Sequence, residues 1–346
     1  MKNTYVENLR DGSRIEDVFL ISSKSIGRTQ DGSAFVRLKL IDRTGSIDAI
    51  KWDAPDALCT CIGVDDYVSV RGVVGKYKDK MQLVLDSVRK HCEKIDPADF
   101  LPRCPRDIGQ MFGDLKEIIA TIREPQLRAL MDSLFGNSEF IERFTSAPAA
   151  LKIHHAYIGG LLEHSLSVAQ LCDMVAGHYP EANRDLLITA AILHDIGKID
   201  EFSWSRSIKY SDSGHLVGHL VSGAMTVDEA VEKIPGFHPL LRMVLTHMIL
   251  SHHGEKEFGS PKRPKSLESL ILHRVEDLDA KVKTFVEAVA PPNGQQETAE
   301  MWTERHWLME RPLLRGLPDS VLGANPSIER DVPAGSEEPE VGLFSE

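Results

Sequence analysis

The sequence predicts a protein in two parts, a small closed β-barrel followed by an all-α helical bundle. Within residues 14–90, apolar and polar side chains alternate in short runs separated by turn signals, which is typical of antiparallel strands. From residue 108 onward the apolar positions recur at helical spacing. The second part also holds 12 of the 14 histidines, between His154 and His273. A chain of 346 residues has room for two or three domains.

The clearest strand covers residues 34–40, and further strand patterns follow at 47–52, 67–71 and 81–85. In the first of these, one face is apolar: Ala34, Val36, Leu38 and Leu40. The turns between strands are marked by Asp31-Gly32, Thr44-Gly45 and Gly75. About five strands in fewer than 100 residues favour a closed five-stranded barrel of the OB-fold type.

The opposite faces of these strands combine aromatic rings with cations: Phe35, Arg37, Lys39, Tyr67 and Arg71. Rings stack on bases and cations bind phosphates, so this set predicts a surface that binds single-stranded nucleic acid with little sequence preference. The alternative is an ordinary solvated sheet face, on which charged residues alternate with core residues in any antiparallel strand.

Residues 97–105 are rich in proline and predict a linker. Helical patterns follow in eight segments: Ile108–Arg123, Pro125–Phe135, Ser138–Phe144, Gly159–His178, Arg184–Gly197, His215–Ile234, His238–Ser251 and Ser266–Ala290. Residues 199–213 are expected to form a loop over a site. Pro291-Pro292 ends the last helix, Trp302–Met309 predicts a short docking helix, and residues 317–346 predict a disordered acidic tail.

The net charge of −12 is unevenly distributed. Residues 1–104 carry 17 basic and 16 acidic side chains, and the remainder carries 23 and 36. Long-range attraction to phosphate is therefore weak, and any nucleic-acid binding must be local to a basic face or a metal site. The five cysteines are scattered, without a CxxC pair, which favours reduced thiols in the cytoplasm. We find no apolar run near the ~20 residues of a membrane span.

The main chemical signal is the pair His194-Asp195, which follows an apolar helix over Leu186–Leu193, with Gly197 as the expected helix stop. Neutral imidazole and carboxylate are preferred ligands of divalent cations. Further ligand types lie on other helical segments: His164, His219, the pair His252-His253, and Asp277. Side chains from several helices can enclose one or two metal ions in the core of a bundle.

The order His…His-Asp…His…His-His…Asp resembles the HD-domain superfamily of metal-dependent phosphohydrolases. The matching segments are Gly159–His164, His194–Lys198, Gly218–Gly223 and Leu250–Gly254. Together with the barrel segments Arg28–Gly32, Asp42–Gly45 and Trp52-Asp53, they make residues 10–290 similar to the YhaM-type 3′-to-5′ exoribonucleases, which consist of an OB-fold followed by an HD domain. Gly259-Ser260-Pro261 and Asp277–Lys281 also match.

This resemblance implies an OB-fold over residues 1–96, connecting helices over 97–148, an HD domain over 149–292, a docking segment over 293–316 and the tail. It also implies removal of nucleotides from the 3′ ends of single-stranded RNA, with single-stranded DNA as a further substrate and Mn²⁺ as the usual metal. Whether the protein forms homo-oligomers is left open.

Following the superfamily pattern, we assign His164, His194, Asp195 and Asp277 to one ion, and Asp195, His219 and His252 to a second. Asp195 can bridge both ions because it has two oxygens. Asp277 matches the last aspartate of the pattern, and Asp279 is the alternative. Mixed nitrogen and oxygen ligands suit Mn²⁺, Fe²⁺, Zn²⁺, Mg²⁺ or Co²⁺.

Asp195 and Lys198 are the expected catalytic residues. Lys198 either contacts a phosphoryl oxygen or is a solvated lysine at a helix end. His253 should point away from His252 and contact substrate or support a ligand, and His155 is a further expected substrate contact. His154 and His215 are ambiguous. The remaining histidines of this region are expected to be structural: His178, His238, His247 and His273.

Two other functions compete with the exonuclease. An HD scaffold can also hydrolyse free nucleotides or cyclic dinucleotides, since fold does not determine substrate. Residues 255–261 lack the Gly-Tyr-Pro element expected of cyclic-dinucleotide enzymes, which counts against that branch. Alternatively, the protein is a non-catalytic nucleic-acid-binding adaptor. The intact set of six ligand positions argues against an adaptor.

Overall fold

The computed structural model describes residues 2–29, 32–77, 80–96, 99–151, 155–290 and 301–316. It divides into two compact units. The first, residues 1–287, contains a β-barrel and a helical bundle, and the second begins at Ala288. The acidic tail lies outside the described residues, so its predicted disorder stays a prediction.

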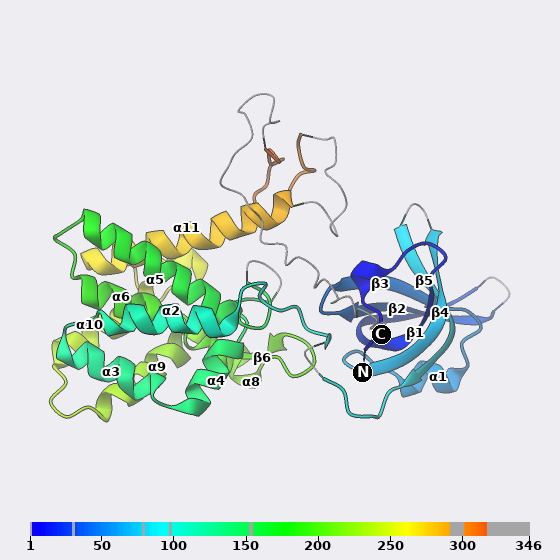
Figure 1. The fold of residues 1–346 in the computed structure, drawn as a ribbon, viewed down its shortest axis with the longest axis horizontal. Coiled ribbons are helices and arrows are strands. Elements are labelled where there is room, and N and C mark those ends of the chain that lie inside the picture. The colour runs from blue at the N-terminus through cyan, green and yellow to red at the C-terminus, as the bar shows by residue number, and fades with distance from the viewer. Residues whose placement is uncertain are drawn as a thin grey trace, which may run out of the picture. The chain divides into compact units, whose positions relative to one another are not determined.

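Five strands close into the barrel in the order β1-β2-β3-β5-β4 (Figure 1). They are β1 (Arg14–Arg28), β2 (Ala34–Asp42), β3 (Gly45–Lys51), β4 (Tyr67–Tyr77) and β5 (Lys80–Lys90). All neighbours are antiparallel except β3 and β5, which run parallel. The predicted OB-type barrel is confirmed. The short helix α1 (Asp56–Cys61) between β3 and β4 was not predicted.

The alternation in β2 positions its side chains as expected. Val36, Leu38 and Leu40 are at most 3 % exposed and fill the barrel, whereas Arg37 and Lys39 point outward. The register shifts between Arg71 and Gly72 in β4. A Cβ on Gly72 would lie 2.2 Å from the carbonyl oxygen of Val84, so this crossing of β4 and β5 requires glycine.

Tyr67 does not lie on an open face as predicted. Only 8 % of the residue is exposed, because the ring of Phe100 packs against it edge-on with centroids 4.8 Å apart. Phe100 itself is 1 % exposed, and the backbone of Asp99 accepts a hydrogen bond from the Arg43 amide. Residues 99–100 of the predicted linker are therefore fastened to the barrel. Sequence alternation alone could not reveal this cover, because it comes from outside the strands.

The helices of the bundle are α2 (Ile108–Ala120), α3 (Pro125–Phe135), α4 (Ser138–Ser146), α5 (Gly160–His178), α6 (Arg184–Leu193), α7 (Lys198–Glu201), α8 (Asp212–Leu216), α9 (His219–Glu232), α10 (Pro239–Ser251) and α11 (Leu267–Val289) (Figure 1). Most agree with the predicted segments. The predicted helix 215–234 is broken at Val217-Gly218, because Gly218 has φ +78°. Helix α6 ends at Leu193, before Gly197. Residues 302–309 are not helical; Trp302 and His306 instead form β-bridges with Leu314 and Arg311.

Helices α5 and α6 lie at the centre of the bundle. Every residue of α6 from Leu186 to Leu193 is buried, as expected of a helix that is apolar on all sides. Helices α5 and α6 contact each other, and Leu162, Leu166, Ile188 and Ile192 belong to the same buried apolar cluster. This core holds the segments that carry His164 and His194. In the described part of the chain, no helix combines the length and apolarity needed to cross a bilayer.

Candidate metal centre

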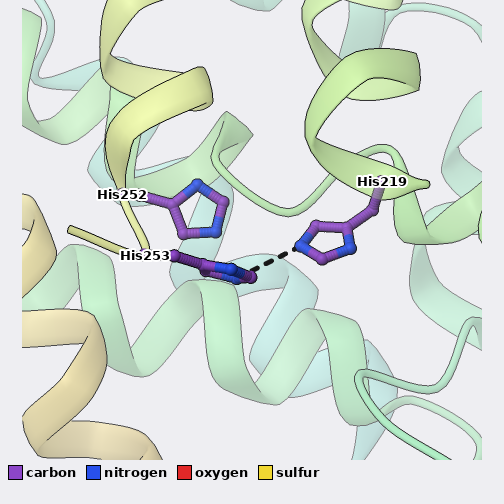
Figure 2. Close-up of side chains that lie close together, drawn as sticks. All are labelled: His219, His252 and His253. Atoms are coloured by element: carbon purple, nitrogen blue, oxygen red, sulfur yellow. Dashed lines mark hydrogen bonds between the residues drawn. The ribbon is translucent and has the colours of Figure 1, made fainter. Parts of the chain in front are cut away.

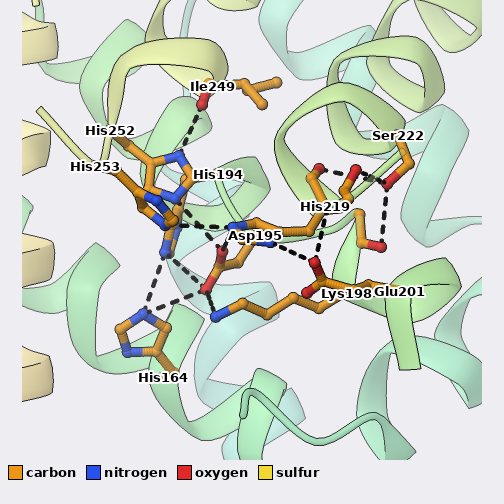
Figure 3. Close-up of polar contacts among 12 residues, drawn as sticks. His164, His194, Asp195, Lys198, Glu201, His219, Ser222, Ile249, His252 and His253 are labelled. Carbon is orange, nitrogen blue, oxygen red and sulfur yellow. Dashed lines mark hydrogen bonds and ion pairs between the residues drawn. The ribbon is translucent and has the colours of Figure 1, made fainter. Parts of the chain in front are cut away.

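Five histidines from four segments of the bundle gather around the carboxylate of Asp195 (Figure 3). His164 is on α5, His194 and Asp195 directly follow α6, and His219 begins α9. His252 and His253 follow α10. The structure thus brings together five of the six predicted metal ligands, and it adds His253.

On one side of Asp195, the atoms lie around Oδ2. His194 Nε2 is 3.3 Å and His164 Nε2 is 3.6 Å from this oxygen, and the two nitrogens are 3.2 Å apart. These three ligand atoms are close enough to bind one cation together. They are almost completely buried, with side-chain exposures of 0–2 %.

On the other side, His219 Nε2 and His252 Nε2 lie 3.6 Å and 3.5 Å from Asp195 Oδ1. His253 joins this group, since its Nε2 lies 3.3 Å from His219 Nε2 (Figure 2). His219, His252 and His253 form a second set of atoms close enough to share one cation. His253 does not point elsewhere than His252 as predicted, because the turn after α10 directs both rings toward His219.

The second nitrogen of each ring determines which nitrogen is free to bind a metal. Each Nδ1 faces an oxygen acceptor at 2.8–3.0 Å: Asp279 for His164, Ala191 for His194, Glu201 for His219, Ile249 for His252 and Phe258 for His253. A neutral ring that donates from Nδ1 carries a lone pair on Nε2. The five Nε2 lone pairs then face one another and Asp195.

This arrangement fits a cation. Lone pairs 3.2–3.3 Å apart, beside a carboxylate, repel one another unless a positive charge lies between them. Moreover, His252 Nε2 and Asp195 Oδ1 are buried and have no hydrogen-bond partner among the described residues. Buried polar atoms normally have partners, so an absent partner here points to a ligand. Histidines held at Nδ1 by carbonyls or carboxylates are typical of metal sites.

The electrostatics favour the ligating forms of three rings and of Asp195, whereas at His194 burial is outweighed by the Asp195 carboxylate, which raises the pKa of that ring. Burial lowers the pKa of His164 and of His253 to about 4, and that of His252 well below its ordinary value, so these rings are neutral at pH 7. Burial opposes ionisation of Asp195, but Lys198 and His194 hold its pKa well below the usual range. Asp195 is therefore a carboxylate.

Lys198 is held inside the site and is not a solvated lysine. Its Nζ lies 2.6 Å from Asp195 Oδ2, and its side chain is 11 % exposed. The neighbouring Gly197 lets α9 pack closely: a Cβ there would lie 2.1 Å from the His219 carbonyl oxygen and 2.5 Å from the Gly223 amide nitrogen. Its φ of −63° is an ordinary helical value, so glycine is needed for close packing against α9 and not to stop a helix.

Asp277 is not brought to the centre. Its carboxylate pairs with Lys281 at 2.7 Å and is 36 % exposed, because successive residues of α11 are turned by about 100°. Asp279, the alternative, contacts His164 Nδ1 and thus supports a ligand.

Sequence reasoning missed Glu276. Burial raises its pKa to about 7, an effect opposed by His194 and reinforced by Asp195.

His155 is not exposed to substrate as predicted. It is 3 % exposed and lies between two carboxylates, with Nδ1 2.8 Å from Glu163 and Nε2 3.5 Å from Asp279. Tyr157 also hydrogen-bonds to Glu163. Burial opposes ionisation of Glu163, but His155 and Tyr157 lower its pKa to about 2. Through its contact with His155, this network holds the Asp279 carboxylate in position. His154 lies outside the described residues, and His215 is exposed beside Tyr210.

Of the residues predicted to form the nucleic-acid surface of the barrel, some lie together on one exposed strand face and others do not. The Phe35 ring lies 5.3 Å from the ring of Trp52, and the Arg37 guanidinium lies 4.9 Å over Phe35. Lys39 is exposed on the same strand face. Trp52 is 44 % exposed and lies just beyond β3; it belonged to the predicted strand pattern 47–52 but not to the predicted binding set. Arg71, on β4, instead pairs with Glu16 at 3.2 Å, and Tyr67 is buried.

Comparison with known proteins agrees with both parts of the chain. The HD-domain family model matches residues 161–281, and the model of an OB-fold nucleic acid binding domain matches residues 20–90. A 3′-5′ exoribonuclease YhaM of Geobacillus sp. is 34 % identical over 90 % of this chain and 94 % of its own length. The proteins of the same name from Bacillus subtilis and Listeria innocua are 33 % and 31 % identical, over 80 % and 78 % of this chain and 88 % and 86 % of theirs.

Proposed function

The chain belongs to the family of YhaM 3′-to-5′ exoribonucleases, and we propose that it shortens single-stranded RNA from the 3′ end by hydrolysis at the centre around Asp195. It is a metal-dependent hydrolase with an OB-fold that binds single-stranded nucleic acid. The products are nucleoside 5′-monophosphates, released one at a time. Single-stranded DNA is a second substrate in this proposal.

The observation that supports the site most directly is the convergence of four histidine Nε2 atoms on the two oxygens of Asp195, with His253 Nε2 beside that of His219. We assign His164, His194 and Asp195 to one ion, without Asp277, whose carboxylate pairs with Lys281. His219, His252, His253 and Asp195 hold the second. Bound divalent ions make hydroxide available near neutral pH and neutralise charge on a phosphoryl group. Mn²⁺ is the expected metal, with Fe²⁺, Zn²⁺, Mg²⁺ and Co²⁺ as alternatives.

The residues of the chain supply position and charge. Asp195 lies between the two histidine groups and fixes their spacing. Lys198 Nζ lies 2.6 Å from Asp195 Oδ2 and, with its side chain 11 % exposed, is placed to contact a non-bridging phosphoryl oxygen. Because the surrounding helices bury the centre, these charges act in a medium of low effective dielectric constant, where they stabilise a developing anion strongly.

The barrel holds the strand upstream. Phe35 and Trp52 offer two rings for bases, and Arg37 and Lys39 offer positive charge for phosphates. Such contacts depend little on base identity, which suits an exonuclease that must bind any sequence. Tyr67 and Arg71 are not part of this proposed surface, because one is buried and the other pairs with Glu16.

The decisive experiment digests single-stranded RNA labelled at either end, with and without Mn²⁺. We expect 5′-labelled RNA to give a descending ladder and 3′-labelled RNA to release labelled mononucleotide at once. Asp195→Asn should abolish release while binding to RNA persists. A ladder from the 5′ end, or full activity of Asp195→Asn in metal-replete buffer, would contradict the assignment. A nucleotide panel in the same assay tests hydrolysis of free nucleotides.

A further inference from the structure

Among the described histidines of the metal centre, His219 and His253 are the most exposed. The side chains of His194 and His252 are 0 % exposed and that of His164 is 2 % exposed, whereas that of His219 is 14 % exposed. His253 is also partly exposed. A polymer therefore reaches the centre past His219 and His253, and the chain segments beside these two residues form the entrance.

One of these segments is the loop of residues 254–265, which we call the entrance loop. The carbonyl oxygen of Phe258 accepts a hydrogen bond from His253 Nδ1 at 3.0 Å. Ser260, only 2 % exposed, places its hydroxyl 2.9 Å from the carbonyl oxygen of Leu250 in α10. The backbone of the loop is thus fixed to the segment that carries His252 and His253.

Two glycines shape this loop. Gly254 and Gly259 have φ of +79° and +86°, the left-handed region that favours glycine. In addition, a Cβ on Gly254 would lie 2.2 Å from the ring of His273, whose Nδ1 donates to the carbonyl oxygen of His252. The two glycines therefore fix the backbone conformation of the short turn Lys256–Phe258 at the entrance.

The side chains of this turn point outward and have the chemistry of a strand-binding surface. Phe258 is 68 % exposed and contributes its backbone, not its ring, to the metal centre. Lys256 and Lys262 are exposed nearby in sequence. Residues 255–265 carry four basic and two acidic side chains, a balance of +2 in a chain of net charge −12. The one ion pair found among these residues joins Arg263 to Glu255 at 2.7 Å.

We propose that the entrance loop is a second binding site for single-stranded nucleic acid, in which Phe258 stacks on a base near the 3′ end and Lys256 and Lys262 contact the adjoining phosphates. Exposed rings beside cations bind single strands with little sequence preference. This inference rests on the proposed function. It adds a site in the bundle itself, so the terminal nucleotides are held where hydrolysis takes place, independently of the barrel.

The test is a double-mutant cycle between Phe258 and single bases of the substrate. Single-stranded RNA 12-mers carry one abasic nucleotide at each of the last four positions in turn, and KM and kcat for release of the first nucleotide are measured with Mn²⁺. In the wild type, one abasic position should raise KM by about 5- to 150-fold, the range expected for loss of one base–aromatic stack. In Phe258→Ala the intact RNA should show that same rise, and the abasic position should add nothing further.

Matched variants separate stacking from general damage. Phe258→Tyr keeps a ring and should behave as the wild type. Tyr179→Ala removes an aromatic residue of similar exposure, 50 %, from the far end of α5, about 22 Å along the helix from His164, and should leave KM unchanged. The metal affinity of Phe258→Ala, measured by calorimetric titration with Mn²⁺, should equal that of the wild type, because His253 is held by a backbone carbonyl.

The phosphate contacts of the two lysines are tested by varying the salt concentration. Removal of one cation that binds a phosphate of a single strand should reduce the slope of log KM against log salt by about 0.7. We expect this reduction for Lys256→Gln and for Lys262→Gln. A wild type that releases no nucleotide from any single strand would refute the proposed function itself. A wild type that is active, with an abasic penalty that persists unchanged in Phe258→Ala, would refute only the entrance-loop site.

Discussion

Asp279 and Asp277 are two residues apart on α11 and have opposite roles: Asp279 Oδ2 accepts a hydrogen bond from His164 Nδ1 at 2.8 Å, whereas Asp277 pairs with the surface residue Lys281. We expect Asp279→Asn to weaken metal binding by about 10- to 100-fold, since the carboxylate fixes the tautomer and orientation of a ligating histidine. Calorimetric titration of the metal-free protein with Mn²⁺ measures this.

Asp277→Asn is the matched control, because it removes the same charge from the same helix at a position that does not contact the centre. It should keep the affinity of the wild type. If Asp277→Asn weakened binding and Asp279→Asn did not, the helix α11 would have to be turned differently about its axis.

This pair also shows how far the sequence could predict the site. His164, His194, His219 and His252 could be assigned because histidine is uncommon and their order along the chain is distinctive. The carboxylates of α11 could not, because Glu276, Asp277 and Asp279 are close in sequence and differ only in helical phase. That phase depends on how Leu272 and Val275 pack into the core, which is a tertiary property.

Bound metal should stabilise the folded protein in addition to enabling hydrolysis. Ligands that bind only the folded state stabilise it in proportion to the logarithm of their concentration, by about 2.7 kcal/mol at 100 times the dissociation constant. We therefore expect chelation to lower the melting temperature and Mn²⁺ to restore it. In Asp195→Asn the same addition should shift the melting temperature little, because the site loses its negative charge and one of the two oxygens that face the histidine groups. An equal shift in both proteins would show that Mn²⁺ binds elsewhere.

On the barrel, Trp52→Ala should raise the dissociation constant for single-stranded RNA by about 5-fold or more, since exposed ring–base stacking contributes about 1–3 kcal/mol. Fluorescence anisotropy with a labelled 12-mer measures this. Phe100→Ala gives the contrasting case. Because Phe100 is 1 % exposed and packs on Tyr67, we expect it to destabilise the protein by about 3–5 kcal/mol instead.

Phe35 and Tyr67 differ in solvent exposure, and this difference explains why the barrel was predicted better than its binding surface. Both alternate with core residues, so the strand pattern correctly placed them outside the barrel. Whether an outward ring meets solvent depends on segments outside the strands, and the strand pattern contains no information on the position of Phe100.

The barrel should also lose stability in acid through Asp66. Its carboxylate accepts from the Gly63 amide at 2.8 Å and pairs with Lys90 at 2.7 Å. Burial opposes its ionisation, but these contacts lower its pKa below the ordinary value of 3.8. A lowered carboxyl pKa stabilises the fold above pH 3.8 and ceases to do so as the pH falls through the folded-state value.

We therefore expect Asp66→Asn to cost on the order of 1 kcal/mol or less at pH 7, and the difference from the wild type to shrink toward pH 3. Hydrogen–deuterium exchange of β4 peptides at the two pH values measures this locally. A difference that is constant with pH would mean that Asp66 acts without its charge.

The close packing at Gly197 gives the sharpest structural prediction. A Cβ there would meet the His219 carbonyl oxygen at 2.1 Å and the Gly223 amide nitrogen at 2.5 Å, so Gly197→Ala must push the start of α9 away from Asp195. We expect this variant to lose affinity at the group of His219, His252 and His253 and to retain binding by His164 and His194. Titration with Co²⁺, followed by its visible absorption, should then show about half the metal bound by the wild type.

Gly113→Ala is the control for helix glycines. Nothing lies within 4 Å of a Cβ at this position in α2, so the substitution should stabilise the protein by about 0.4–1 kcal/mol through the unfolded chain and leave metal binding intact. Full metal stoichiometry in Gly197→Ala would mean that α9 can move without carrying His219 away, and that the two groups of histidines are less tightly coupled to the backbone than the contacts of Gly197 imply.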